Sequence, residues 1–131
     1  MENHLRAALI DWLRDDPALG PINTIEEESP LRAAPPWLGI SASAAIDWGS
    51  KDRKGREVRI ALELASRADH PAADGAILSA IENRVLELPP FQENFELASV
   101  RFLRSRSEAR DNNLRASLLE FRFRLFAPLS E

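Results

Sequence analysis

The sequence predicts an α+β fold, a mainly antiparallel sheet of four or five strands with two helices packed on one face. A stripe of apolar residues at helical spacing opens the chain, and a second such stripe lies near its middle. Several other segments alternate apolar and polar residues with the period of two that a half-buried strand shows. At 131 residues, the chain is expected to form one domain over residues 1–131 with a single core.

The first helix is predicted near the N-terminus, where apolar residues recur three and four positions apart and charged residues take the other faces. It is expected to end near Asp15, because Pro17 and Pro21 follow and proline removes a backbone donor that a helix needs. The stripe consists of Leu5, Ala8, Leu9, Trp12 and Leu13.

A first hairpin is predicted from two alternating segments, residues 37–45 and 56–65, which a charged loop separates. Lys54 and Gly55 form a natural turn in that loop. Residues 22–26 are a candidate for a further short strand. The covered faces of the two long segments are expected to carry Leu38, Ile40, Ala42 and Ala44, and Val58, Ile60, Leu62 and Leu64.

A second helix is predicted at about Pro71–Glu87, since proline suits the first helical position and Pro89 stops the pattern. Two long extended segments follow, residues 95–106 and 114–126, with the polar connection Ser107–Asn113 between them. They are expected to form a second hairpin. The core face of the last strand is predicted to carry Leu119, Phe121, Phe123 and Leu125.

The pattern between residues 95 and 106 is blurred. Val100 and Phe102 lie on one face of an ideal strand, and Leu97 and Leu103 lie on the other. This predicts either a β-bulge or a second buried surface, and in a small domain a second buried surface indicates a partner.

Composition excludes several classes of protein. Hydrophobic residues make up 44% and charged residues 29%, as in a globular protein, and the net charge of -4 argues against a general nucleic-acid binder. The absence of cysteine excludes disulfides, thiolate metal sites and cysteine nucleophiles. With no apolar run near the roughly 20 residues that span a bilayer, and no leader-like N-terminus, the protein is expected to stay in the cytoplasm, away from membranes.

Charge is unevenly distributed along the chain. Residues 1–50 contain three basic and eight acidic side chains, whereas residues 51–131 contain fourteen basic and thirteen acidic ones. A solvated acidic face is the simpler interpretation, and complementarity to a neighbouring copy is the alternative.

No arrangement of residues indicates catalysis, a metal or a cofactor. His4 and His70 belong to different predicted helices and share no pattern with carboxylates. The run Glu26–Glu28 points to alternate sides of an extended chain, and solvation explains it better than chelation. No serine lies in a nucleophile elbow, and the five glycines never cluster into a phosphate loop. We therefore expect a protein that is not an enzyme.

Arginines concentrate on the final hairpin. Glu108, Asp111 and Glu120 are interspersed among them, and exposed aromatic residues that would stack on bases are not evident. Ion pairs with a neighbouring subunit, or plain solvation, are therefore better interpretations than nucleic-acid binding. The arginines are Arg101, Arg104, Arg106, Arg110, Arg115, Arg122 and Arg124.

Trp48 stands apart from the other aromatic residues. It lies between Asp47 and Gly49 at the predicted tip of the first hairpin, where the sequence offers it little apolar cover. Two interpretations stay open: the indole packs back on the sheet, or it anchors an interface.

Four segments, by their order and spacing, carry a resemblance over almost the whole chain. They are the opening helix at Leu5–Leu9, the strand entry Pro35–Leu38, the charged loop and strand Asp47–Val58, and the closing strand Leu119–Arg124. In this order they resemble the phage tail-completion family, which includes tail terminators and their gene-transfer-agent relatives. The acidic run Glu26–Glu28 departs from the family pattern.

Similarity to tail terminators implies a structural protein without turnover. Such proteins form a ring, commonly hexameric, that caps the finished tail tube, ends its polymerisation and joins it to the head connector. The implied partners are further copies of the chain, the major tail tube protein and the head connector or stopper protein. DNA would pass through the ring lumen without specific binding, and the ring would end in the virion tail.

A closed ring needs a heterologous interface, in which one face of each subunit meets a different face of the next. The charged loop at the first hairpin tip and the polar tip of the second hairpin are the segments expected to contact the tube or a neighbour. The expected interface residues are Asp47, Trp48, Lys51, Asp52, Arg53, Lys54, Arg110, Asp111 and Asn112.

Two other classes of function fit the sequence less well. A small ligand-binding or regulatory module also combines helices with an antiparallel sheet, but it would require a convergent polar pocket that the sequence does not indicate. A hydrolytic enzyme has less support still, because no nucleophile and base occur in a recognisable arrangement.

Overall fold

The computed structural model describes residues 1–28, 33–67, 69 and 71–128. Within these residues it confirms the α+β prediction, with two α-helices and a five-stranded sheet. In chain order the elements are α1 (Glu2–Arg14), a 3₁₀ turn η1 (Pro17–Leu19), β1 (Thr24–Glu26), β2 (Trp37–Asp47), β3 (Gly55–Arg67), α2 (Pro71–Leu86), β4 (Glu96–Arg110) and β5 (Leu114–Phe126). Among the described residues, no helix is long and apolar enough to cross a membrane.

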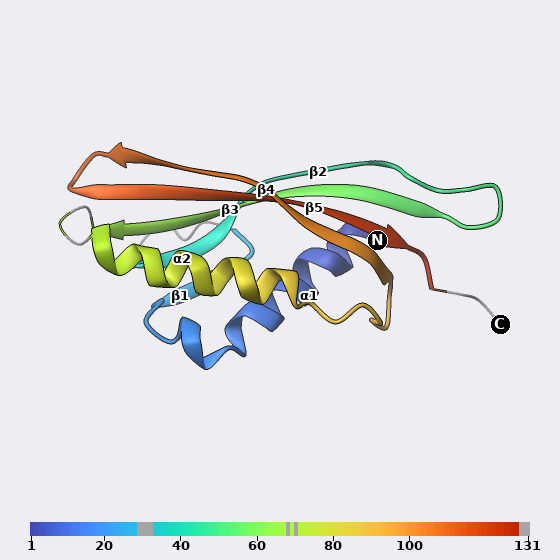
Figure 1. Cartoon of the computed structure of the whole chain (residues 1–131), viewed down its shortest axis with the longest axis horizontal. Helices are drawn as coiled ribbons and strands as arrows, with labels where there is room; N and C mark the ends of the chain where they lie inside the picture. The colour runs from blue at the N-terminus through green and yellow to red at the C-terminus, as the bar shows by residue number, and fades with distance from the viewer. Residues whose placement is uncertain (29–32, 68, 70, 129–131) are drawn as a thin grey trace.

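The sheet has the order β1-β2-β3-β5-β4, and both predicted hairpins are confirmed. β2 pairs with β3, and β4 with β5, in antiparallel fashion, while the short β1 runs parallel to β2 at the edge. β3 and β5 pair antiparallel along their full length, from Gly55 opposite Phe126 to Arg67 opposite Leu114. The turns of the two hairpins therefore lie at opposite ends of the sheet, as Figure 1 shows.

The helices and β1 cover one face of the four long strands (Figure 1). The core lies between these layers, and the apolar faces predicted for β3 and β5 are both buried in it. Ile60 pairs with Phe121 in the register, and Leu62 pairs with Leu119. Burial of a large apolar side chain contributes about 1.5–3 kcal/mol, so this face supplies much of the folding energy. From the helices, the core receives Leu5, Leu9, Leu13, Ile81 and Val85.

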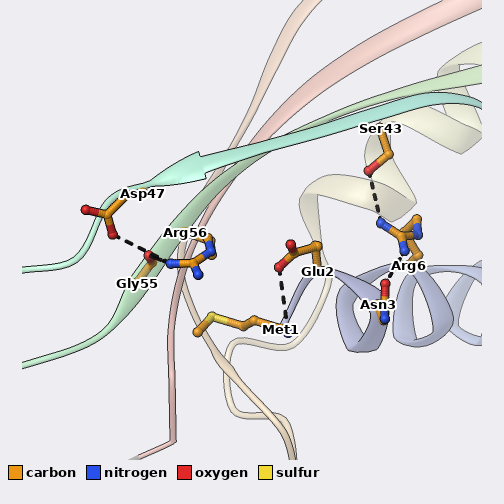
Figure 2. Close-up of polar contacts among 8 residues, drawn as sticks. All are labelled: Met1, Glu2, Asn3, Arg6, Ser43, Asp47, Gly55 and Arg56. Atoms are coloured by element: carbon orange, nitrogen blue, oxygen red, sulfur yellow. Dashed lines mark hydrogen bonds and ion pairs between the residues drawn. The ribbon is translucent and has the colours of Figure 1, made fainter.

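A β-bulge in β2 overturns one prediction. The register shifts between Ile40, which pairs with Leu62, and Ala42, which pairs with Ala61. The extra residue reverses the alternation, so the residues after it change faces. Ala42 and Ala44, which we expected on the covered face with Leu38 and Ile40, are exposed on the opposite face. Ser43 instead lies on the helix side, where its hydroxyl accepts a 3.3 Å hydrogen bond from Arg6 Nη1 (Figure 2).

β4 contains two register shifts, which explain its blurred pattern. They fall between Leu97 and Ser99 and between Phe102 and Arg104. The first shift returns Leu97 to the helix side, where it is buried and pairs with Leu125. Of the two explanations left open by the sequence, the bulge is therefore confirmed.

Two polar contacts fix the helix layer to the sheet. The Ser66 hydroxyl donates a 2.6 Å hydrogen bond to Asp74 Oδ2 in the first turn of α2, and both residues are buried. Arg14 Nε, at the end of α1, donates a 2.7 Å hydrogen bond to the Ile25 carbonyl of β1. A buried polar group without such a partner would cost about 1–3 kcal/mol.

A candidate assembly surface on the sheet

In the described chain, no helix covers the second face of the sheet, which we call the bare face (Figure 1). Cross-strand pairing sets its side chains in rows that run over β2, β3, β5 and β4. Many of these side chains are basic. The arginines on this face are Arg59 and Arg67 of β3, Arg122 and Arg124 of β5, and Arg101, Arg104, Arg106 and Arg110 of β4.

Trp48 lies at one end of the bare face, where it is half-buried against the sheet. Its ring centroid is 5.0 Å from that of Phe126, the last residue of β5. The guanidinium of Arg124 lies 5.3 Å from the centroid of the indole. The first interpretation, in which the indole packs back on the sheet, therefore describes the free chain. An interface role for the exposed part of the ring stays a prediction.

Arg53, in the charged loop between β2 and β3, also contacts this pair of aromatic rings. Its guanidinium carbon lies 4.4 Å from the centroid of the Phe126 ring, and Nη2 donates a 3.1 Å hydrogen bond to the Ala127 carbonyl. Nη2 also lies 3.4 Å from Glu96 Oε1. The loop is thus bound to the ends of β4 and β5 through an arginine, which offers both a flat cation for the ring and several donors.

The rest of the charged loop is more exposed. Lys51, Asp52 and Lys54 point to solvent, although the Lys54 carbonyl accepts a 2.9 Å hydrogen bond from Ala127 N. Asp47 and Arg56 are cross-strand partners, and Asp47 Oδ1 lies 3.6 Å from Arg56 Nη1 (Figure 2). This hairpin end therefore presents charges of both signs, and its backbone is hydrogen-bonded to the residue after β5.

The remaining predicted interface residues lie at the other end of the sheet. β4 extends to Arg110, so the turn contains only Asp111, Asn112 and Asn113 rather than the whole predicted connection 107–113. Asn112 and Asn113 have φ values of 62° and 59°, a left-handed conformation that asparagine tolerates well. Arg110 Nη2 lies 2.7 Å from Glu108 Oε1. The predicted residues thus form two separate groups, and the sheet holds them apart.

The central feature of the bare face is a row of three arginines, which could not be predicted from the sequence. Arg59, Arg122 and Arg101 are register partners on the adjacent strands β3, β5 and β4. Their alternation with core residues was visible in the sequence, but their alignment depends on pairing between distant strands. We call them the arginine row.

The acids beside the arginine row are already engaged by other arginines. Glu120 receives hydrogen bonds from Arg104 Nε at 2.5 Å and Nη2 at 3.2 Å. The Arg104 hydrogen bond lowers the pKa of the Glu120 carboxyl, and the charge of Arg59 acts in the same direction. Glu57 accepts a 3.1 Å hydrogen bond from Arg124 Nε. Within the described part of the chain, Nε of Arg122 is buried and has no hydrogen-bond partner.

On the helix side, an open groove of about 550 Å³ runs between α1 and the segment 88–95. Trp12 and Leu88 contribute apolar surface, and Phe91 on its border is 80% exposed. Its acidic residues are Asp11, Asp15 and Glu93. We call it the acidic groove.

No metal site is evident in the described part of the chain, where no three His, Asp or Glu side chains gather in a group that could hold an ion. His4 is exposed at the acidic groove, whereas His70 lies outside the described residues.

Comparison with known proteins decides the family. The sequence model of the family described as tail completion protein gp17 matches residues 7–125, which is most of the chain. The chain belongs to this family. The resemblance drawn from the sequence is confirmed, and this tail completion protein is a structural component of a phage-like tail. No curated protein has a significant sequence match to it.

The fold of this tail completion protein has a counterpart among solved structures. A chain in the structure titled "Virion of native gene transfer agent (GTA) particle" superposes with a TM-score of 0.79 at 19% sequence identity. The match covers 94% of this chain and 95% of the other. At that identity the likeness shows a shared fold, extending over nearly the full length of both chains.

Proposed function

We propose that this tail completion protein forms a hexameric ring, as tail terminators commonly do, and that the ring caps the tail tube. The ring ends polymerisation of the tube and joins it to the head connector. Family membership over residues 7–125 is the observation that carries the proposal, and the likeness to a chain of a gene transfer agent particle supports it.

The proposed partners are further copies of the chain, the major tail tube protein and the head connector or stopper protein. DNA passes through the lumen without specific binding. The protein works as one structural domain without turnover, and it moves from the cytoplasm, where it assembles, into the tail of the particle. The acidic groove gives the ligand-binding alternative little support, because it is open and its charged groups are of one sign.

The two ends of the sheet suit contacts along the axis of a tail. One end presents the loop with Asp47, Trp48 and Lys51, and the other presents the turn with Asp111 and Asn112. Because the strands hold these groups at opposite ends, a subunit can contact different neighbours with each. We assign one end to the tail tube and the other to the head side.

Deletion of the gene in a particle-producing strain tests the proposal. Electron micrographs should then show tails of irregular length that are not attached to filled heads, and wild-type protein supplied from a plasmid should restore normal particles. Tails of normal length joined to filled heads in the deletion strain would contradict the proposed function.

Charge reversal tests the loop end. At the other end, a change at Asn112 would strain its left-handed backbone as well as alter the charge. The variant Lys51→Glu with Lys54→Glu avoids this problem, because both lysines are exposed and lie away from that turn. It should fold normally and fail to restore head attachment in the deletion strain. Asn83→Glu, an exposed change on α2 away from both ends of the sheet, is the control and should complement fully.

A further inference from the structure

We propose that the bare face, centred on the arginine row Arg59, Arg122 and Arg101, is the docking surface for the acidic groove of a second copy of this chain. The proposal rests on the ring function above and names the two surfaces that meet between neighbouring subunits. They lie on opposite layers of the fold, so the contact is heterologous and can continue from copy to copy.

The arginine row is electrostatically unbalanced in the isolated chain. Like charges directly opposite one another on paired strands are destabilising. The nearest acids, Glu57 and Glu120, are held by Arg124 and Arg104, and the buried Nε of Arg122 has no partner within the described residues. Carboxylates from outside the chain would pair with the exposed side chains of Arg59 and Arg101 and reduce the repulsion.

The surface beside the row is hollowed and carries arginines. A hollow of about 290 Å³ is lined by Ala42, Ala44, Ala61 and Leu103, together with Arg59, Arg104 and Glu120. Arginine is enriched at protein contacts. Bases would require exposed aromatic residues to stack on, and the rows around this hollow contain none.

The helix layer supplies the complementary surface. Asp15 and Glu93 in the acidic groove are exposed, and they have no ion-pair partner among the described side chains. Phe91 on the groove border is 80% exposed and projects an apolar ring that suits the alanine-lined hollow. Acid meets arginine and apolar meets apolar when the groove of one copy faces the bare face of the next.

Charge exchange between the two surfaces provides the test. One variant carries Arg59→Glu and Arg101→Glu, a second carries Asp15→Lys and Glu93→Lys, and a third combines all four changes. Each single-surface variant should weaken self-association, measured by sedimentation over a wide concentration range, by about tenfold or more. The combined variant should recover, and so should a mixture of the first two, whose subunits would alternate. Asn83→Glu, an exposed change on α2 that lies outside both surfaces, should behave as the wild type does.

Complementation of the deletion strain by the same variants gives a second measurement. The proposal is supported if the single-surface variants fail to complement the deletion strain and the combined variant complements it. It is overturned if the single-surface variants associate and complement normally, if the combined variant does not recover, or if the wild type neither associates nor is needed. Loss of binding to duplex DNA without loss of self-association would identify nucleic acid as the occupant and would also overturn it.

The two proposals fail in different ways. Normal particles from the deletion strain, together with charge-dependent self-association, would remove the ring function and leave the docking surface in place. Defective particles that the charge exchange does not rescue would leave the ring function and remove the docking surface.

Discussion

Trp12 and Arg84 form a reciprocal contact between the two helices. Trp12 Nε1 donates a 2.7 Å hydrogen bond to the Arg84 carbonyl, and Arg84 Nε donates a 2.8 Å hydrogen bond to the Trp12 carbonyl. The guanidinium carbon also lies 3.2 Å from the centroid of the indole ring. Two hydrogen bonds and a cation–π contact thus join α1 to α2 at one point.

We expect Arg84→Ala to lower the free energy of unfolding by about 1–3 kcal/mol, because it removes a donor and the cation above the indole. Urea denaturation measures the loss. Arg84→Lys keeps the charge without the planar donor geometry and should fall between the variant and the wild type. An unchanged midpoint for Arg84→Ala would show that the contact between the helices contributes nothing to stability.

Trp48→Ala should destabilise the free chain by about 0.5–1.5 kcal/mol, since it removes the ring that packs on Phe126 and lies beside Arg124. Trp48→Phe should retain most of that stability. Thermal unfolding measures both variants, and complementation then tells whether the phenylalanine variant still builds tails. If Trp48→Ala unfolds at the wild-type temperature, the indole serves contacts outside the chain only.

Two glycines form a matched pair. A Cβ at Gly55 would meet the Leu125 carbonyl oxygen at 2.8 Å and the Trp48 carbonyl oxygen at 3.0 Å, both of them backbone atoms. A Cβ at Gly75 in α2 would meet no atom within 4 Å. We expect Gly55→Ala to destabilise the fold and Gly75→Ala to stabilise it by about 0.5–1 kcal/mol. Chemical denaturation measures both, and equal effects of the two changes would contradict this reading of the hairpin end.

The Glu120 carboxyl should give stability a pH dependence. The hydrogen bond from Arg104 lowers its pKa below the ordinary value of 4.5, so the folded state binds this proton less readily than the unfolded state does. Its contribution is therefore fully present above pH 4.5 and is lost as pH falls through the lowered pKa. The difference in stability between the wild type and Glu120→Gln should shrink over that range.

Because Arg104 is largely exposed, this contribution should be small and should weaken with added salt. Carbon-detected NMR titration of Glu120 provides a direct measurement, and Arg104→Gln should return the pKa toward its ordinary value. A Glu120 pKa that does not respond to Arg104→Gln would show that the pair is absent in solution.

Much of the fold could be predicted from periodicity because burial acts locally on each element. The apolar faces of β3 and β5, the stripe of α1 and the limits of α2 all follow from residues a few positions apart. The bulge in β2 could not be predicted in this way. One extra residue at Ser41 moved Ala42 and Ala44 to the other face, and only the pairing with β3 reveals it.

In the candidate site, too, some features follow from local sequence pattern and others depend on tertiary contacts. The sequence by itself determined the family, the elements and the two hairpin tips, because these depend on local pattern and on the order of segments along the chain. Only the tertiary structure decided that Trp48 packs on Phe126 and that Arg59, Arg122 and Arg101 share one row. Those contacts join residues far apart in the sequence, and their alignment is set by the register of the strands, which no single segment encodes.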